Sequence, residues 1–265
     1  MKILNGSELA GFIKERQAHQ VASLKATGII PHLLILRDSD NPVITKYVDL
    51  KIKYGTDIGV IVKDYRANDG DALREEIIHA NTDDAIHGII IQLPLHDKSQ
   101  TDTLCNLIAP AKDVDGLSSH GHYDSATATA INWLLAGSDI RLDNAKIALV
   151  GRGKLVGAPL YKMFTASNYH VESFHRGSDL TTLSQYDVII TATGVPGLIT
   201  SDLVKPGAVL VDAGTASEKG VLKGDVAPEV RERTDLTAIT PVTGGVGPLT
   251  VTCLFDHVIQ AAKSL

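Results

Sequence analysis

Short runs rich in Val, Ile and Leu alternate with longer amphipathic stretches along this chain of 265 residues. Nearly continuous hydrophobic runs are typical of strands that are covered on both faces, whereas amphipathic stretches are typical of helices. Their alternation predicts an α/β protein whose parallel sheets carry helices on both faces. The predicted strands are residues 32–37, 59–64, 88–92, 147–151, 170–175, 188–193, 208–212 and 237–240. The predicted helices are about residues 7–27, 42–55, 70–82, 99–108, 127–137, 156–167 and 248–264.

An interruption between the third and fourth predicted strands indicates two domains. Pro110 and the glycine-containing segment 116–121 break the alternation there. We place the boundary near residue 123, so that residues 1–122 form the first domain and residues 123–247 form the second. The final helix, residues 248–265, follows a glycine-rich segment and is expected to return to the first domain.

Composition and charge narrow the class of protein. Hydrophobic residues make up 44% of the chain and charged residues 21%, which is usual for a soluble globular enzyme. The net charge of -6, without a lysine- or arginine-rich run, argues against nucleic acid or an anionic membrane as a partner. No signal peptide or membrane-spanning run is evident, and Cys105 and Cys253 have neither disulfide-framework nor metal-ligand spacing. A cytoplasmic protein without a metal site is therefore expected.

Tyr47 and Lys51 are four residues apart in a predicted helix. Asn41 is a favoured N-cap residue and Pro42 is favoured at the first helical position, so the helix is expected to begin there. Residues four apart lie on one helix face, where the ring can stack on a flat substrate while the amine moves protons beside it. The same spacing also occurs on ordinary solvated helix faces, so it indicates chemistry only together with other residues.

A glycine turn follows the fourth predicted strand. Gly151, Gly153 and Gly157 have the spacing G-x-G-x-x-x-G, one residue longer than the usual dinucleotide-binding pattern, and a helix is predicted from Val156. Glycines at such a turn let backbone N–H groups at the helix N-terminus approach a pyrophosphate. A plain turn between strand and helix would have similar glycines, but the order strand, turn, helix, strand favours a dinucleotide.

The residues that follow the next strands favour NADP over NAD. His175 and Arg176 stand where an NAD enzyme usually has a carboxylate for the ribose 2′-hydroxyl, and with Arg152 they offer cations for a 2′-phosphate. A solvent-facing loop would also accommodate Arg176. Thr193 and Gly194 close the following strand, where a small residue and a turn leave room for nicotinamide or ribose.

Three further segments carry candidate chemistry. Gln92 ends a buried strand, where open α/β sheets bind ligands, although an amide there can also be a capped surface residue. Asp115 precedes a glycine in a predicted turn. Asp-Gly turns are common without any function, but a fixed carboxylate can accept two hydrogen bonds from an amidine-like ring edge such as a pterin presents. Gly244 and Gly245 belong either to a flexible connector or to bare backbone that approaches a flat ligand.

Together these segments resemble the bifunctional methylenetetrahydrofolate dehydrogenase/methenyltetrahydrofolate cyclohydrolases. The matching segments are YVDLK, HGIIIQLPL, KDVDGL, GRGKLVG, KPGAVLVDAG, KGDV and ITPVTGGVGPLT, in family order over nearly the whole length. The resemblance implies two α/β domains with folate in the cleft between them, NADP on a Rossmann-like second domain, and usually a homodimer. It implies oxidation of 5,10-methylenetetrahydrofolate with NADP, followed by hydrolysis of the methenyl product to 10-formyltetrahydrofolate, in one-carbon metabolism.

The resemblance also implies roles for individual residues. Lys51 resembles the family's catalytic lysine, and such a lysine needs its pKa lowered from about 10.4 toward roughly 7–8 to activate water. Tyr47 resembles the ring that stacks on the folate aminobenzoate, Gln92 the partner that holds the lysine, and Asp115 the pterin-binding carboxylate. Further folate contacts are expected from Leu93, Pro94, Gly244, Gly245 and Pro248. Cofactor contacts are expected from Thr127, Gly151, Arg152, Gly153, Val156, Gly157, His175, Arg176, Thr193, Gly194, Gly214 and Thr215.

The chain departs from the family pattern mainly at the domain junction and near the cofactor. Residues 125–130 replace the family's P-C-T-P-x-G with Ser-Ala-Thr-Ala-Thr-Ala, and the loss of both prolines predicts a looser turn. Gly153 and Arg176 each stand where serine is usual, and His96 follows QLPL where proline is usual. Hydride transfer is therefore the less secure of the two activities.

Three alternatives stay open. A cyclohydrolase with weak or lost dehydrogenase activity would keep the folate residues beside an altered 125–130 segment. A non-catalytic folate- or dinucleotide-binding protein would not need a proton-transfer lysine. A generic NADP dehydrogenase would explain the second domain but not the YxxxK, QLPL and DVDG segments.

Overall fold

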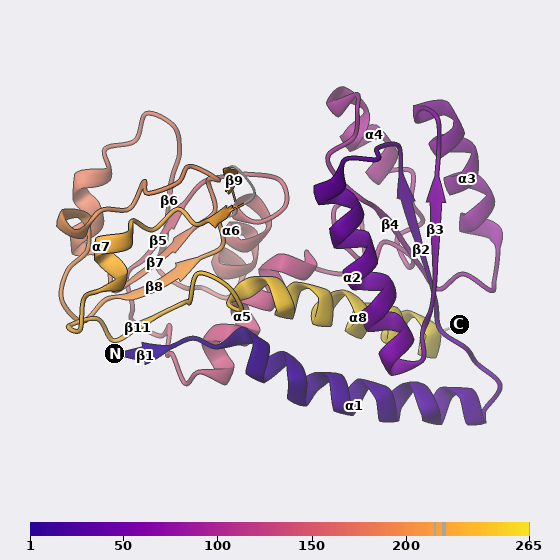
Figure 1. Ribbon diagram of the computed structural model, residues 1–265, viewed down its shortest axis with the longest axis horizontal. Helices are drawn as coiled ribbons and strands as arrows, with labels where there is room; N and C mark the ends of the chain where they lie inside the picture. The colour runs from indigo at the N-terminus through magenta and orange to yellow at the C-terminus, as the bar shows by residue number, and fades with distance from the viewer. Residues whose placement is uncertain (215, 219–220, 265) are drawn as a thin grey trace. The chain divides into compact units, whose positions relative to one another are not determined.

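The computed structural model describes residues 1–214, 216–218 and 221–264, and the chain divides into two compact units (Figure 1). The first unit comprises Gly11–Ala126 with Val251–Leu265, and the second comprises Met1–Ala10 with Thr127–Thr250. Two long helices contribute to both units, namely α1 (Gly6–Ala26) and α8 (Val246–Ser264). Among the described residues no helix is long and apolar enough to cross a membrane, and no cluster of acidic, His or Cys side chains could hold a metal ion.

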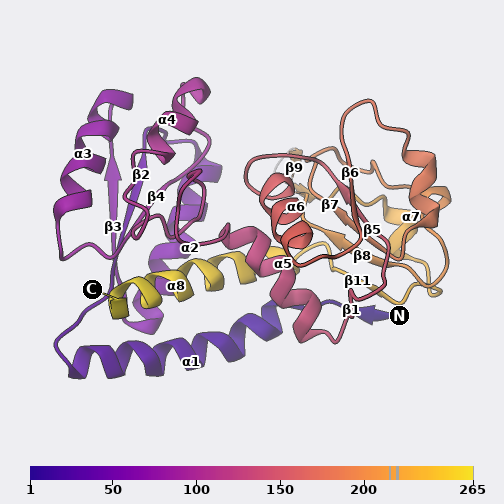
Figure 2. The same cartoon turned by 180° about the vertical axis from the view of Figure 1, so that it is seen from behind.

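The first unit is built on a three-stranded parallel sheet with strand order β3-β2-β4. The strands are β2 (His32–Arg37), β3 (Ile61–Arg66) and β4 (Gly88–Ile91), and Leu36 of β2 lies opposite Ile91 of β4. Helix α2 (Pro42–Ile58) lies in front of these strands in Figure 1 and behind them in Figure 2, so it covers one face of the sheet. The other helical elements are α3 (Gly70–Thr82), the 3-10 turn η1 (Lys98–Gln100) and α4 (Thr101–Cys105).

The core of the first unit consists of side chains from these strands and helices. Gly55 of α2 is packed so tightly that a Cβ there would lie 2.3 Å from a methyl carbon of Val62 and 3.1 Å from the Phe255 ring of α8. The buried core residues include Leu34, Leu36, Leu73, Ile77, Ile89, Ile91, Leu104 and Ile108. Because β2 and β4 are covered on both faces, their sequences are nearly continuous in aliphatic residues, whereas the exposed β3 has a mixed sequence.

The second unit contains a six-stranded parallel sheet with strand order β1-β11-β8-β7-β5-β6. The chain passes from β5 outward to β6 and then returns past β5 to β7, so the strand order reverses at β5 and β7. The strands are β1 (Lys2–Ile3), β5 (Ile147–Val150), β6 (Val171–Phe174), β7 (Val188–Thr191), β8 (Val209–Asp212) and β11 (Ala238–Ile239).

Helical segments and a small hairpin complete the second unit. The hairpin pairs β9 (Ala216–Glu218) with β10 (Val221–Lys223) in antiparallel fashion. The helical segments are α5 (Ala126–Gly137), α6 (Gly157–Ala166), η2 (Leu180–Gln185), η3 (Ser201–Leu203) and α7 (Pro228–Arg231). Val150, Phe174, Leu183, Ile189, Leu210, Val226, Val230 and Ile239 belong to the core of this unit.

The predicted fold class is confirmed, because the chain has two α/β units with parallel sheets. The sequence pattern did not predict β1, which has two residues, nor the β9–β10 hairpin. A two-residue strand has no periodicity of its own, and β1 exists because it pairs with β11 far along the chain.

Residues 126–130 form the beginning of α5, in agreement with the helix predicted at 127–137, and Ser125 directly precedes it. Ala126, Ala128 and Ala130 are fully buried, and alanine has the highest intrinsic helix propensity. The Ala126 N–H also donates a 3.1 Å hydrogen bond to the carbonyl oxygen of Asp115. Small side chains here permit a buried helical start.

Candidate functional site

Lys51 and Gln92 meet in the first unit. Asn41 caps α2 by accepting a 2.9 Å hydrogen bond from the Val43 N–H, as the sequence predicted, and Lys51 lies three turns further along the helix. The Lys51 ammonium donates a 2.6 Å hydrogen bond to Oε1 of Gln92, which directly follows β4. Tyr47, one turn before Lys51, has a 41% exposed side chain whose ring is free to contact a ligand. The helix and the strand end therefore bring these three residues together.

The electrostatics around Lys51 couple it to Asp115. Burial lowers the pKa of Lys51 from its ordinary value, and the Asp115 carboxylate partly opposes this effect. Burial raises the pKa of Asp115 to about 6, although the positive charge of Lys51 works in the opposite direction and Asp113 adds to the rise. Each group is thus desolvated beside an opposite charge, and burial moves the pKa of each toward neutral pH.

The loop that carries Asp115 is held by its neighbour Asp113. The buried Asp113 carboxylate accepts a 2.8 Å hydrogen bond from the Ser118 N–H, which closes the loop. Gly116 has a φ of 66°, and a Cβ there would lie 2.4 Å from the carbonyl oxygen of Asp124. Only glycine fits this turn, so Gly116 is required by geometry. The two aspartates differ in role, because Asp113 binds backbone within the loop while Asp115 is coupled to Lys51.

His257 of α8 binds the backbone of the same loop. Nδ1 of the buried His257 lies 2.8 Å from the carbonyl oxygen of Val114, so this nitrogen carries the proton and donates it. The Tyr123 ring stacks on the imidazole at a centroid distance of 4.8 Å. Burial lowers the pKa of His257, which keeps the ring neutral at neutral pH. The backbone next to Asp115 is thereby fixed by a residue 143 positions away in sequence.

Lys112, although part of the same motif, has a structural role. Its buried ammonium donates hydrogen bonds of 2.9 and 2.8 Å to the carbonyl oxygens of Ala80 and Asp83. These carbonyls lie at the C-terminal end of α3, where helices leave such acceptors unpaired. The lysine therefore caps a helix and is not available to a substrate.

In the second unit, the predicted glycine turn joins β5 to α6. Gly151 has a φ of 105°, and a Cβ on Gly157 would lie 2.0 Å from the Gly151 carbonyl oxygen, so both positions require glycine. A Cβ on Gly153 would have no neighbour within 4 Å. Val156 occupies the N-cap position of α6 without a side-chain hydrogen bond. The turn therefore has no side-chain cap at Val156 and an open position at Gly153, which suits a pyrophosphate-binding turn.

The candidate cations follow β5 and β6 at the same edge of the sheet. The guanidinium carbon of Arg152 lies 4.7 Å from the centroid of the Tyr161 ring of α6, which supports this side chain. The His175 N–H donates a 3.0 Å hydrogen bond to the Ser178 hydroxyl and closes the turn after β6. Both His175 and Arg176 are exposed. Strand β5 lies between β6 and β7, where the strand order reverses, which is where open α/β sheets bind nucleotides.

Two buried aspartates organise the ends of β7 and β8. Asp225 accepts hydrogen bonds of 2.7 and 2.9 Å from the N–H and the hydroxyl of Thr193. A Cβ on Gly214 would lie 2.0 Å from Asp225 Oδ1, so this position also needs glycine. Asp212 accepts a 3.0 Å hydrogen bond from the Asp225 N–H and forms an ion pair with Arg231, while burial raises the pKa of Asp212. The network fixes Thr193 and Gly214 at neighbouring strand ends.

The glycine-rich segment before α8 is packed within the second unit. Gly244 accepts a 2.9 Å hydrogen bond from the Ser7 N–H, and a Cβ on Gly6 would lie 1.9 Å from the Gly245 carbonyl oxygen. Close packing against the start of α1 is thus one reason for these glycines. Pro248 lies in the first turn of α8, where proline is favoured.

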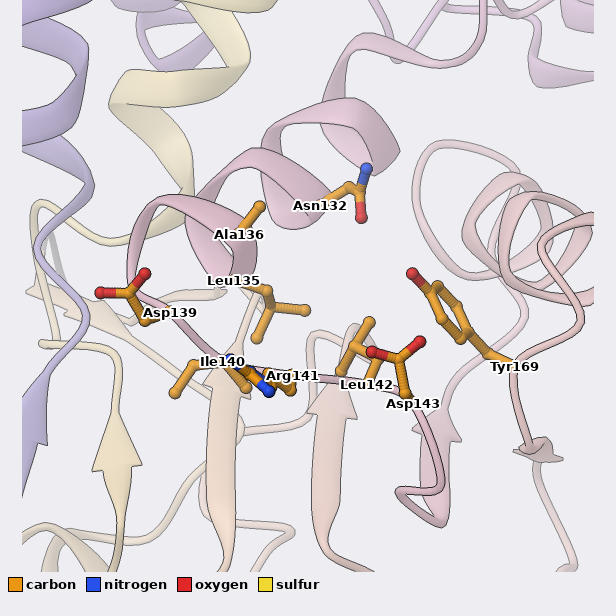
Figure 3. Close-up of a pocket in the computed structure, with 9 residues that line it drawn as sticks. All are labelled: Asn132, Leu135, Ala136, Asp139, Ile140, Arg141, Leu142, Asp143 and Tyr169. Atoms are coloured by element: carbon orange, nitrogen blue, oxygen red, sulfur yellow. The ribbon is translucent and has the colours of Figure 1, made fainter.

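A pocket lies elsewhere in the second unit (Figure 3). It has a volume of about 410 Å³, and the side chains of Asn132, Asp143 and Tyr169 border it. Asp143 precedes β5 and Tyr169 precedes β6, so the pocket lies at the amino ends of these strands. The glycine turn and Arg176 follow the carboxyl ends of the same strands, so the pocket is not the expected cofactor site.

The structure thus collects the expected residues into two sets. Tyr47, Lys51, Gln92, Leu93, Pro94 and Asp115 lie in the first unit. Most of the expected cofactor residues lie at the ends of β5–β8 in the second unit. Val156 and Gly157 instead begin α6, and Thr127 lies in the first turn of α5. Thr215 is outside the described residues. Sequence reasoning missed the supporting residues Asp113, Asp225 and His257. The KGDV motif pointed to Asp225, whereas no local signal pointed to His257, whose partner is distant in sequence.

Comparisons with known proteins agree with this arrangement. The tetrahydrofolate dehydrogenase/cyclohydrolase family matches through its catalytic domain at residues 4–115 and its NAD(P)-binding domain at residues 125–265. The bifunctional protein FolD of Macrococcus caseolyticus is 38% identical and aligns over 99% of this chain and 98% of its own.

Solved structures give the same result. The bifunctional FolD enzyme of Campylobacter jejuni has a TM-score of 0.94 with 33% identity, covering 100% of this chain and 99% of its own. The Trypanosoma brucei enzyme, solved with NADP cofactor and inhibitor, has a TM-score of 0.90 with 27% identity, covering 99% and 97%. With both domains matched over nearly the whole length, this chain belongs to the tetrahydrofolate dehydrogenase/cyclohydrolase family.

Proposed function

We propose that the chain oxidises 5,10-methylenetetrahydrofolate with NADP and then hydrolyses 5,10-methenyltetrahydrofolate to 10-formyltetrahydrofolate. The observation that carries this proposal is the 2.6 Å hydrogen bond between Lys51 and Gln92, with the Lys51 charge coupled to Asp115. The proposal assigns tetrahydrofolate derivatives chiefly to residues of the first unit, with Gly244, Gly245 and Pro248 of the second unit as further contacts, and NADP to the second unit. It also accords with the family to which both halves of the chain belong.

In the hydrolytic step, Lys51 is proposed to accept a proton from the water that attacks the methenyl carbon. A lysine can do so only in its neutral form, and burial raises the neutral fraction by lowering the pKa of Lys51. The cationic substrate would lower this pKa further, since a nearby positive charge disfavours the ammonium. Gln92 holds the nitrogen in position with the 2.6 Å hydrogen bond. The bond from this carbon to N5 then breaks, N5 takes up the proton that the added hydroxyl loses, and the formyl group remains on N10.

Asp115 and Tyr47 are proposed to orient the folate. The Asp115 carboxylate is an acceptor for the N–H groups at the pterin edge, and its raised pKa of about 6 still leaves it mostly ionised at neutral pH. The exposed Tyr47 ring offers a stacking surface for the aminobenzoate. Leu93, Pro94, Gly244, Gly245 and Pro248 are the further folate contacts that we propose.

NADP, when bound, would accept the hydride from the methylene carbon. The turn after β5 suits its pyrophosphate, because Gly153 is open and the N-terminus of α6 lacks a side-chain cap. Arg152, His175 and Arg176 are proposed to bind the 2′-phosphate, since no carboxylate stands at the end of β6 to select a free 2′-hydroxyl. Thr127, Thr193 and Gly214 are proposed to line the nicotinamide and ribose side, and hydride transfer depends mainly on positioning.

We also propose a cytoplasmic homodimer. Strand β6 is at the edge of the six-stranded sheet, so one side of its backbone is available for pairing with a second copy. Sedimentation analysis of the purified chain tests this point, since a monomer at all concentrations would exclude the dimer.

The proposed reactions are tested by incubating the protein with 5,10-methylenetetrahydrofolate and either NADP or NAD, while reduced cofactor and methenyl product are followed separately. Reduction of NADP followed by decay of the methenyl signal is the expected result. Methenyl hydrolysis without reduction of either cofactor would instead support a cyclohydrolase that has lost its dehydrogenase activity, the alternative suggested by the altered 125–130 segment. Absence of both reactions would overturn the proposal.

A further inference from the structure

Asp38 is a buried carboxylate beside the loop that carries Gln92. It directly follows β2, and 8% of its surface is exposed. Among the described residues, its hydrogen bonds come from the backbone N–H of His96, at 3.0 Å to one carboxylate oxygen and 3.2 Å to the other. The imidazole of His96 is 70% exposed, and its Nδ1 is 3.9 Å from Asp38. The close contact is therefore made by the backbone and not by the ring.

This pair completes the anchoring of a five-residue loop. At its beginning, the Gln92 N–H donates a 2.8 Å hydrogen bond to the carbonyl oxygen of Leu36, the last β2 residue paired with β4. In its middle, the Leu95 side chain is 3% exposed and packs in the core. At its end, the His96 N–H binds Asp38. Strands β2 and β4 are neighbours, so both backbone anchors join the ends of adjacent strands (Figure 1).

The loop conformation determines how the Gln92 amide faces Lys51. Nε2 of Gln92 donates a 3.3 Å hydrogen bond to the carbonyl oxygen of Leu93 within the loop, which directs Oε1 toward the Lys51 ammonium. If the loop end shifted, the Leu93 carbonyl would move and the amide would lose this orientation. A rotated amide would present its N–H groups to the Lys51 ammonium, and an ammonium cannot accept a hydrogen bond.

We propose that Asp38 and the backbone N–H of His96 form a positioning pair that sets the Gln92 amide for Lys51. The idea rests on the proposed function, because Lys51 must act in hydrolysis for the pair to matter. A charged acceptor strengthens the single backbone hydrogen bond, and burial shields it from water. Any residue except proline supplies the N–H at position 96, so the histidine found after QLPL, where proline is usual in the family, is what makes this contact available.

Three variants separate the backbone contact from the side chain. His96→Pro removes the N–H, Asp38→Leu removes the acceptor while keeping a similar volume, and His96→Ala keeps the N–H but removes the ring. We expect the first two variants to lose about tenfold in kcat/KM for methenyltetrahydrofolate hydrolysis, as for a lost charge-assisted hydrogen bond. His96→Ala should remain within about twofold of the unmodified chain, since its backbone contact is intact.

The pH profile distinguishes positioning from a general loss of structure. The Lys51 ammonium donates to Gln92, so loss of that acceptor disfavours the charged amine. The acidic limb of the hydrolysis profile should therefore move to lower pH in His96→Pro and Asp38→Leu, but not in His96→Ala. Lower activity with an unmoved limb, or equal loss in all three variants, would overturn the proposal.

Folding and the underlying activity are checked in the same experiment. Thermal unfolding identifies variants that do not fold. If His96→Pro does not fold, the result for Asp38→Leu decides the question. If neither variant folds, the pair is needed for the fold itself and the inference is overturned. An unmodified chain without hydrolytic activity would overturn the proposed function, whereas an active chain with indifferent variants would overturn only the positioning pair.

Discussion

The Lys51 ammonium donates a 2.6 Å hydrogen bond to Oε1 of Gln92, and its positive charge acts to lower the pKa of Asp115. The three residues come from helix α2, the end of β4 and a loop that starts beside β4. Burial lowers the pKa of the lysine and raises that of the carboxyl group, so both approach neutral pH from opposite sides. A proton acceptor and a ligand anchor thus share one desolvated region, where each affects the other's protonation.

Asp115→Asn is expected to alter both the affinity and the pH dependence. The carboxylate titrates with a pKa of about 6, so kcat/KM of the unmodified chain should fall as the pH drops below about 6. In the asparagine variant the part of the acidic fall that comes from Asp115 should disappear, while the part that comes from protonation of Lys51 remains. The KM for folate should rise about tenfold or more, because a charged acceptor is lost. Steady-state kinetics between pH 5 and 8 check this prediction. The exposed Asp71 of α3 provides the matched control Asp71→Asn, and an unchanged profile in Asp115→Asn would contradict the assignment.

The same Asp115→Asn substitution should stabilise the folded chain above pH 6. The folded-state pKa of Asp115 is raised above its ordinary value of 3.8, so the folded state favours the protonated form. The contribution of this group to stability is therefore present at low pH and is lost as the pH rises through about 6. Urea unfolding at pH 5 and pH 8 should give a larger gain for the variant at pH 8. A larger gain at pH 5 would show that the sign is wrong.

Alanine substitution should have different effects at Gly157 and Gly153, two glycines of the turn after β5. In Gly157→Ala the new Cβ would lie 2.0 Å from the Gly151 carbonyl oxygen, so we expect a loss of about 1–3 kcal/mol in unfolding free energy. In Gly153→Ala the new methyl meets no protein atom within 4 Å, so stability should be unchanged. The KM for NADP should nevertheless rise in Gly153→Ala if a pyrophosphate approaches there. An unchanged KM in a stable Gly153→Ala protein would argue against this binding turn.

Arg176→Ala should selectively weaken NADP use. Loss of a charged donor to the 2′-phosphate is expected to raise the KM for NADP about tenfold or more while leaving the KM for NAD nearly unchanged. Arg141→Ala is the matched control, because Arg141 lines the pocket at the opposite edge of the same sheet. Equal effects on both cofactors would mean that Arg176 does not bind the 2′-phosphate.

His257 should make the folded chain sensitive to acid. Burial lowers its folded-state pKa below the ordinary value of 6.5, so its contribution to stability is present above pH 6.5 and is lost as the pH falls below it. His257→Gln should lose less stability than the unmodified chain between pH 7 and pH 5, as measured by urea unfolding. The exposed His19 gives the control variant His19→Gln. Equal acid sensitivity in both variants would contradict a buried, neutral His257.

Much of the fold and of the candidate site can be predicted from short segments. The capped start of α2, the buried strand before Gln92 and the glycine turn after β5 each depend on neighbouring residues, so local patterns indicate them. The supporting contacts are different in kind. Asp38 with His96 and Val114 with His257 join residues 58 and 143 positions apart, and neither pair has a local pattern.

The buried start of α5 illustrates the same limit. The helix at 127–137 could be predicted, because alanines are strong helix formers. The full burial of Ala126, Ala128 and Ala130 depends on tertiary packing, which no local pattern indicates.

The most direct test of the account compares Lys51→Met with Lys53→Met in both reactions. Lys53 lies two residues away on the same helix, and its side chain is 75% exposed. The account predicts that Lys51→Met retains measurable NADP reduction but loses methenyltetrahydrofolate hydrolysis by at least about a hundredfold, as expected for a proton-transfer group. Lys53→Met should retain both activities. Full hydrolysis by a folded Lys51→Met protein would contradict the assignment of Lys51 as the proton acceptor.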